Sequence, residues 1–312
     1  MSEKKPIAHL TQGAPMGVVP PDGENEPGID TRRRYLASDA FGVLCFLAMT
    51  TCLLALVGLL AMVIINGLPW VSWKLLSSFP SRTPENAGIL SALVGSVWLI
   101  SLTVLISVPI GIGSALYLEE YSKPSRWRRL VQLNIANLAG VPSIVYGILG
   151  LGLFVRAMSL QRSVLAGALT LTLVVLPIVI LSAQEALRAV PKSIRLGSYA
   201  LGATRWQTTW HQVLPAALPG MMTGVILAMA RALGEAAPLL AVGAVAYIAY
   251  VPRTLSDEFT ALPLQIYNWA SRPQAEFHGL ASAAIIVLLA VLILLNAGAV
   301  FVRSRYGKRV KW

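Results

Sequence analysis

The chain has few charged residues and very little cysteine or histidine for its length. Only 12% of its 312 residues are charged, whereas about 25% is typical of soluble domains. The two cysteines, Cys45 and Cys52, lie on one apolar run, about 10 Å apart along a helix and too far apart for a mutual disulfide. Three histidines without metal-type spacing, and no Ser/His/Asp arrangement, make a metal centre or an enzyme of its own the least expected class.

Long apolar runs take up most of the chain, of which 56% is hydrophobic. Each run contains at least the ~20 residues that a helix needs to cross ~30 Å of hydrocarbon. We therefore predict an all-α polytopic membrane protein. The six predicted transmembrane helices cover roughly residues 41–66, 89–117, 135–155, 164–184, 219–249 and 279–302.

The net charge of +11 is unevenly distributed along the chain. With six spans and a cytoplasmic N-terminus, the segments on the cytoplasmic side hold 18 of the 25 Lys and Arg residues. This asymmetry follows the positive-inside rule and predicts that both termini are cytoplasmic. It indicates a multi-pass protein of the plasma membrane in contact with lipid, and it argues against nucleic acid as a partner.

We divide the chain into four parts. Residues 1–38 are rich in Pro, Gly and acidic residues, which predicts a disordered cytoplasmic tail without the layout of a signal peptide. Residues 39–86 contain the first transmembrane helix and an external loop. Residues 87–305 form the core with five transmembrane helices, and residues 306–312 are a basic cytoplasmic tail.

The loop between the fourth and fifth spans, about residues 187–218, contains a short amphipathic helix. Its apolar stripe has helical spacing, and we expect the helix to end at Pro215. The residues of the stripe are Ala203, Trp206, Trp210 and Val213. From the residues alone, this helix either places its apolar face in the groove of a partner protein or lies on the membrane with its tryptophans in the interface.

Arg231 and Glu235 are ionisable residues within the predicted fifth span. A charge near the bilayer midplane is costly and is a functional candidate by default, and the i, i+4 spacing lets the two side chains meet. They either face a substrate pathway or form a structural ion pair with a neighbouring subunit. Gly234 and Pro238 beside them predict a hinge in the helix.

The predicted third span begins with Gly140-Val141-Pro142-Ser143. Its small residues favour close helix packing, with Ser143 as a further candidate for a substrate contact. Pro142 frees the carbonyl of Leu138, which then needs another partner at membrane depth. The chain has no G-x-x-x-x-G-K-[ST] motif, so we expect any ATP to be handled by another polypeptide.

Several stretches together resemble a known family. The loop, with Gly202-Ala203 and Leu214-Pro215, resembles the EAA loop of ABC importer permeases, and five stretches resemble the A-type permeases of Pst phosphate transporters. These five are Val108–Gly113, Tyr117–Tyr121, Gly140–Gly147, Ala230–Leu240 and Gln265–Ala270. The resemblance covers about residues 87–305. One departure is Leu196, which stands where the loop has a glutamate, so we expect docking to depend more on Trp206 and Trp210.

The resemblance implies the fold of a type I ABC importer permease in a bacterial inner membrane, importing inorganic phosphate. It implies a C-type permease as heterodimeric partner, two ATPase subunits that bind ATP and magnesium, and an extracytoplasmic phosphate-binding protein, with no cofactor on this chain. It also favours ATPase coupling through Gly202, Ala203, Trp206, Trp210, Val213 and Pro215.

For the pair in the fifth span, the resemblance favours a role for Arg231 in binding phosphate oxygens. Glu235 would hold the arginine in place, or accept the proton of monohydrogen phosphate. Two other functions stay open: a permease for another oxyanion such as sulfate or molybdate, and a secondary transporter driven by an ion gradient.

Overall fold

The computed structural model describes residues 31–245 and 247–307, which fall into two units, one ending at Val57 and one beginning at Gly58. Helix α1 (Thr31–Gly67) contains the predicted first span, but it begins within the segment that we predicted as a disordered tail. Residues 31–38 contain neither Gly nor Pro and include good helix formers, so the helix extends beyond the apolar run. The rest of the predicted tail lies outside the described residues.

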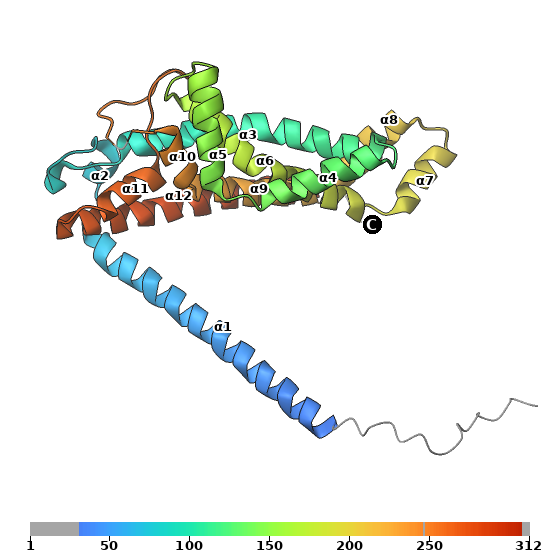
Figure 1. The fold of residues 1–312 in the computed structure, drawn as a ribbon, viewed down its shortest axis with the longest axis horizontal. Coiled ribbons are helices and arrows are strands. Elements are labelled where there is room, and N and C mark those ends of the chain that lie inside the picture. The colour runs from blue at the N-terminus through green and yellow to red at the C-terminus, as the bar shows by residue number, and fades with distance from the viewer. Residues whose placement is uncertain (1–30, 246, 308–312) are drawn as a thin grey trace, which may run out of the picture. The chain divides into compact units, whose positions relative to one another are not determined.

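Four long helices of the second unit run side by side (Figure 1). They are α3 (Leu90–Leu116), α6 (Val164–Ala189), α9 (Leu214–Gly234) and α12 (Ala275–Gly307). Small residues let the backbones approach closely: a Cβ on Gly111 would lie 2.6 Å from Val179, and one on Gly224 would lie 2.1 Å from Ser182. Helix α3 continues directly into the π-helical turn η3 (Tyr117–Tyr121).

Shorter elements lie at one end of this bundle (Figure 1). They are the 3₁₀ turns η1 (Leu68–Trp70) and η2 (Pro84–Asn86) and the helices α2 (Trp73–Ser77) and α11 (Leu262–Ala270). Leu75, Trp269 and Phe277 are buried together there. The predicted external loop is therefore folded onto the ends of α3 and α12, because its apolar side chains find a core.

The predicted third span is not one straight helix. It is divided into α4 (Arg126–Ala139) and a second segment made of α5 (Ser143–Gly150) and the π-helical η4 (Leu151–Ala157), with a bend of 102° between the two parts. The break falls at Gly140-Val141-Pro142, because the proline cannot donate to the preceding turn. As expected, the carbonyl of Leu138 has partners: the Tyr146 hydroxyl donates to it at 2.7 Å and the Val141 N–H at 3.1 Å.

The predicted end of the loop helix at Pro215 is wrong. One helical run extends from Arg205 to Gly234 through α8 (Arg205–Thr208), the π-helical η5 (Thr209–Val213) and α9. Pro215, the second residue of α9, follows the widened turn η5, and this turn accommodates the missing N–H inside the continuous helix. The run ends at Gly234 rather than at residue 249, and α10 (Ala237–Val242) follows after a short break.

Five helices of the described residues are long and apolar enough to cross a membrane, and the bent pair makes a sixth if it counts as one span. The prediction of an all-α membrane protein is confirmed. Within the described ranges the chain has only one isolated β-bridge, between Ser163 and Glu258. The last five residues of the predicted basic tail lie outside these ranges.

Candidate functional site

The ion pair predicted in the fifth span is present. Nε of Arg231 donates to Oε1 of Glu235 at 3.1 Å, and the Arg231 side chain is 44% exposed whereas that of Glu235 is 18% exposed. Glu235 is the only partner of the Arg231 side chain among the described residues, so its two terminal nitrogens keep their donors free. A guanidinium held at one edge and open at the other can bind a carboxylate or phosphate through its fork.

The pair spans the point where α9 ends. Gly234 is the last residue of α9, Glu235 has an extended backbone with φ −81° and ψ 110°, and Pro238 lies in the first turn of α10. The predicted hinge residues thus mark a real break in the helix. The backbone around Glu235 is not held by a continuous hydrogen-bond ladder, and a hinge movement at this break stays a prediction.

Helix α5 packs against α10 beside this break. Gly147 makes the contact, since a Cβ there would lie 2.7 Å from the backbone of Pro238. Ser143 is half-buried one turn earlier on α5. The structure gives no contact between Ser143 and the Arg231–Glu235 pair, so its role in the pathway stays a prediction.

The loop between the fourth and fifth spans is built from α7 (Lys192–Ala200) and α8, joined by a tight turn. Gly202 has φ +81°, a left-handed conformation that glycine adopts without strain, and it terminates α7. Thr204 caps α8: its hydroxyl accepts from the N–H of Gln207, whose side chain accepts from the Thr204 N–H. The family resemblance includes Gly202. The cap formed by Thr204 and Gln207 was not predicted, although the T-x-x-Q spacing in the sequence indicates it.

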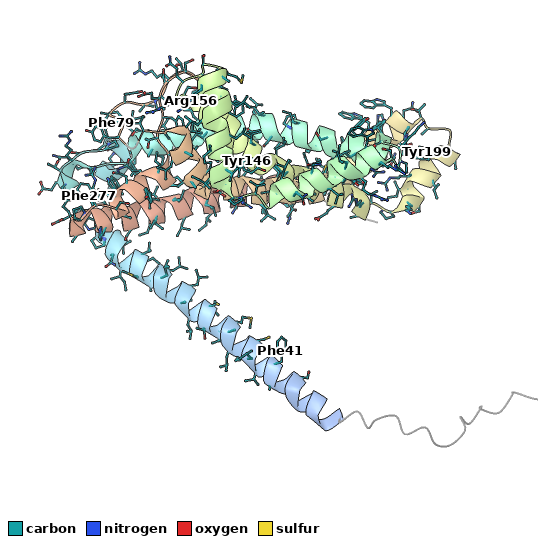
Figure 2. All side chains as sticks on the ribbon, in the orientation of Figure 1. Phe41, Phe79, Tyr146, Arg156, Tyr199 and Phe277 are labelled. Atoms are coloured by element: carbon teal, nitrogen blue, oxygen red, sulfur yellow. The ribbon has the colours of Figure 1, made fainter. Side chains whose placement is uncertain are left out.

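Trp206 and Trp210 form an exposed aromatic surface on this loop. Their rings stack with centroids 5.4 Å apart and planes 13° apart, and the residues are 60% and 51% exposed. Ala203 is half-buried beside them. Tyr199 on α7 marks the same end of the bundle in Figure 2, opposite the end marked by Phe277.

Val213 does not belong to this exposed surface. It is fully buried in a cluster with Ile180, Ala217 and Met221, whereas the prediction placed it on the same stripe as the tryptophans. The π-helical turn η5 changes the register of the stripe by widening one turn, which directs Val213 into the core. Val213 therefore anchors the loop, and Pro215, which is exposed, is the second residue of α9.

Three charged residues near the loop were not predicted to have a role. Glu119 and Glu120 on η3 and Arg195 on α7 form a network at the end of the bundle. The sequence signal is a pair of adjacent carboxylates directly after the second predicted span, whereas Arg195 lies 75 residues after Glu120 in the loop between the fourth and fifth spans. Among the described residues there is no group of three His, Cys, Asp or Glu that could hold a metal ion.

The comparisons with known proteins agree with this architecture. The model of a family described as "Binding-protein-dependent transport system inner membrane component" matches residues 107–309. The chain belongs to this family. It is therefore a multi-pass inner-membrane permease, a subunit of a binding-protein-dependent transport system.

The sequence similarity between this permease and its relatives covers different lengths of the chain. It is 32% identical over 285 residues to the phosphate transport system permease protein PstA 1 of Mycobacterium tuberculosis (strain ATCC 25618 / H37Rv), covering 88% of this chain and 89% of that protein. It is 36% identical over 185 residues to the probable ABC transporter permease protein YqgI of Bacillus subtilis (strain 168), covering 59% and 63% respectively.

Solved structures show the same fold at low identity. A bacterial ABC transporter involved in the import of the acidic polysaccharide alginate matches with a TM-score of 0.57 and 16% identity, covering 88% of this chain and 97% of that chain. A MetNI methionine ABC transporter in an inward-facing conformation matches with a TM-score of 0.54 and 19% identity, covering 75% and 96%. The permease thus has the fold of ABC importer permeases.

Proposed function

We propose that this permease forms half of the translocation pathway of an ATP-driven importer for inorganic phosphate. The observation that carries the proposal is the Arg231–Glu235 pair at a helix break within a membrane span. Only Nε of the guanidinium is bonded to Glu235, and its two terminal nitrogens keep their donors free. The phosphate transport permeases that it resembles over 88% of its length support phosphate as the substrate.

Arg231 attracts the phosphate oxygens, and Glu235 limits how tightly they are held. One edge of the guanidinium is already bonded to the carboxylate, so a passing anion binds only at the free nitrogens and can leave again. The Glu235 carboxylate can in addition accept the proton of monohydrogen phosphate, a hydrogen bond that sulfate cannot donate. The break at Gly234 supplies the mobility that opening and closing of the pathway requires.

The remaining parts of the importer are separate polypeptides. A second permease of the C-type completes the pathway, an extracytoplasmic protein delivers phosphate, and two ATPase subunits bind ATP and magnesium. The stacked Trp206 and Trp210 are the surface on which an ATPase docks, because a pair of large exposed aromatic rings fits an apolar groove. This chain holds no cofactor and hydrolyses no ATP.

Uptake of radiolabelled phosphate into vesicles that carry the assembled complex tests the proposal, with ATP supplied to the ATPase side and excess sulfate as competitor. We expect uptake that requires ATP and does not respond to sulfate. Uptake blocked by sulfate would assign a broader oxyanion permease, and uptake without ATP would favour an ion-gradient transporter.

Variants of the ion pair test the site itself. Arg231→Gln should lower phosphate uptake by about 10- to 100-fold, because a hydrogen bond to a charged group contributes about 1.5–3 kcal/mol. Glu235→Gln should make uptake sensitive to sulfate, since the carboxylate charge that repels the unprotonated anion is replaced by an amide that can donate to it. Arg156→Gln is the matched control, because Arg156 is exposed on η4 and its side chain has no partner among the described residues. Wild-type uptake and selectivity in both pair variants would reject the pathway role.

A further inference from the structure

Arg195 on α7 is bonded to a buried carboxylate at the end of α3. Its Nε and Nη2 donate to Glu120 on η3, with a shortest distance of 2.7 Å between Nη2 and Oε1. The Glu120 side chain is only 7% exposed and that of Arg195 is 19% exposed. A two-point contact of this kind fixes the orientation of the guanidinium as well as its distance from the carboxylate.

The same arginine also caps α6. Nη1 donates to the carbonyl of Val190 at 2.8 Å, and Nη2 donates to that of Leu187 at 2.9 Å. These carbonyls lie at the C-terminal end of α6, where the last carbonyls lack donors from a further turn, although that of Leu187 also accepts from the Val190 N–H at 3.3 Å. One side chain therefore joins α7 to both α3 and α6.

The neighbouring carboxylate extends the network. Glu119 accepts from Gln184 at 3.0 Å and from Arg188 at 2.6 Å, both on α6, and from Arg128 on α4 at 3.4 Å. Replacing a buried ion pair by apolar residues is often neutral for stability. A gain in stability therefore does not explain this network of ion pairs. A role in fixing the positions of α4 and α6 relative to η3 does explain it.

The network is connected to the exposed tryptophans by short contacts. The hydroxyls of Ser198 on α7 and Thr208 on α8 are 2.8 Å apart. The Arg205 guanidinium on α8 lies 5.8 Å from the centre of the Tyr121 ring on η3. The helix that carries Trp206 is therefore linked to α3 by two routes, one through α7 and one directly.

We propose that the Arg195–Glu120 pair is the joint through which movement of the ATPase-facing loop reaches α3 and α6. This rests on the proposed function, in which an ATPase docks on Trp206 and Trp210. Without the joint, such movement would act mainly on α9, because α8, η5 and α9 are one helical run and the exposed Arg205–Tyr121 contact alone would link α8 to η3. With the joint, three of the four long helices move together. Arg195 and Glu120 are positioning residues: they hold the loop against the ends of α3 and α6 and act on transport only through these helices.

The test compares Arg195→Gln, Glu120→Gln and the double variant in vesicles that contain the assembled complex. The readouts are the ATPase that copurifies with the permease, the rate of ATP hydrolysis and the phosphate imported per ATP hydrolysed. We expect normal copurification and continued hydrolysis, with import per ATP about tenfold lower in each single variant. The double variant should be no worse than either single one, because both changes break the same contact.

A matched control and a conservative variant complete the test. Lys192→Gln removes a charge from the same helix, where Lys192 is exposed without a side-chain partner among the described residues, and should leave import per ATP unchanged. Arg195→Lys keeps the buried charge balanced but loses the fork, so it should fold and still lower import per ATP.

Two results would overturn the joint: unchanged import per ATP in Arg195→Lys, or losses of uptake in the Gln variants that only follow losses of assembled complex. ATP-independent uptake by the unaltered complex would instead overturn the proposed function.

Discussion

Tyr146 stabilises the turn between α4 and α5 through a single hydrogen bond. Its side chain is buried, and its hydroxyl donates to the Leu138 carbonyl, which also accepts from the Val141 N–H at 3.1 Å. We expect Tyr146→Phe to lower the free energy of unfolding by about 0.5–1.5 kcal/mol, because one hydrogen bond across the bend is lost while the Leu138 carbonyl keeps its backbone donor. Thermal unfolding in detergent measures the change.

Tyr267→Phe is the control for this variant. Tyr267 on α11 is 57% exposed and its hydroxyl has no partner among the described residues, so the same chemical change should have no measurable effect. Equal melting temperatures for the two variants would show that the bond at Leu138 contributes nothing.

Asp257 organises the loop before α11. Its carboxylate accepts from the Thr254 hydroxyl at 2.6 Å and from the backbone amides of Arg253 and Thr254 at 2.7 and 2.9 Å. The hydroxyl first, and then the two amides, hold the pKa of Asp257 below its ordinary value. The ordering of the loop is therefore complete at neutral pH and is lost as the pH falls through this lowered pKa.

Hydrogen exchange of residues 253–258, corrected for the intrinsic rate at each pH, checks this prediction. Protection should decrease on acidification in the unaltered protein. In Asp257→Asn it should be weaker at neutral pH and should not depend on pH. A pH profile that is the same in both proteins would contradict it.

Single-residue chemistry was the part of the site most accessible to sequence reasoning. The Arg231–Glu235 pair was expected because two opposite charges in an apolar run have few other groups with which to pair. The sequence predicts that the Leu138 carbonyl has a hydrogen-bond partner, but it does not predict that Tyr146 is this partner. Tyr146 comes four residues after the proline, and only the bend of the chain brings its hydroxyl to that carbonyl.

At the scale of elements, α5 and α10 are held together by a contact that requires glycine. A Cβ on Gly147 would lie 2.6 Å from Ala241 and 2.7 Å from the backbone of Pro238. We expect Gly147→Ala to destabilise the protein by about 1–3 kcal/mol through overpacking, and to impair transport through the displaced α10. Thermal unfolding and phosphate uptake measure the two effects.

Gly152 on η4 provides the matched substitution. A Cβ at Gly152 meets nothing within 4 Å, so Gly152→Ala should be neutral or stabilise the helical segment by up to about 1 kcal/mol. If both variants unfolded at the same temperature, the close packing of α5 on α10 would not matter for stability.

Two π-helical segments explain side-chain directions that the sequence pattern does not predict. At η5, the widened turn carries the helix through Pro215 and directs Val213 into the core. At η3, it places Glu119 toward α4 and α6 and Glu120 toward α7. A periodicity of 3.6 residues cannot reveal such turns, because the extra residue is accommodated only when neighbouring helices select it.

At the scale of the whole molecule, the exposed tryptophans should determine assembly with the ATPase. Trp206→Glu adds a charge to the stacked pair, so an apolar groove can no longer receive it, and we expect copurification of the ATPase and uptake to be lost. The chain itself should still insert, because Trp206 is mostly outside the core.

Trp73→Glu provides the comparison for assembly. Trp73 on α2 is 80% exposed and lies at the opposite end of the bundle (Figure 1), so this variant should keep the ATPase. A pull-down in which Trp206→Glu retains as much ATPase as Trp73→Glu would refute the docking surface. Loss of the ATPase in both variants would indicate a general failure of assembly.

The sequence by itself determined the class of protein and the family. These follow from the cost of leaving backbone groups unpaired in lipid and from a few motifs, both of which are local properties of the chain. The continuous helix from Arg205 to Gly234 and the Arg195–Glu120 contact were decided by tertiary structure alone. Each depends on contacts between residues far apart in the sequence, such as Glu120 and Arg195, and no local pattern encodes which of several possible partners the fold brings within reach.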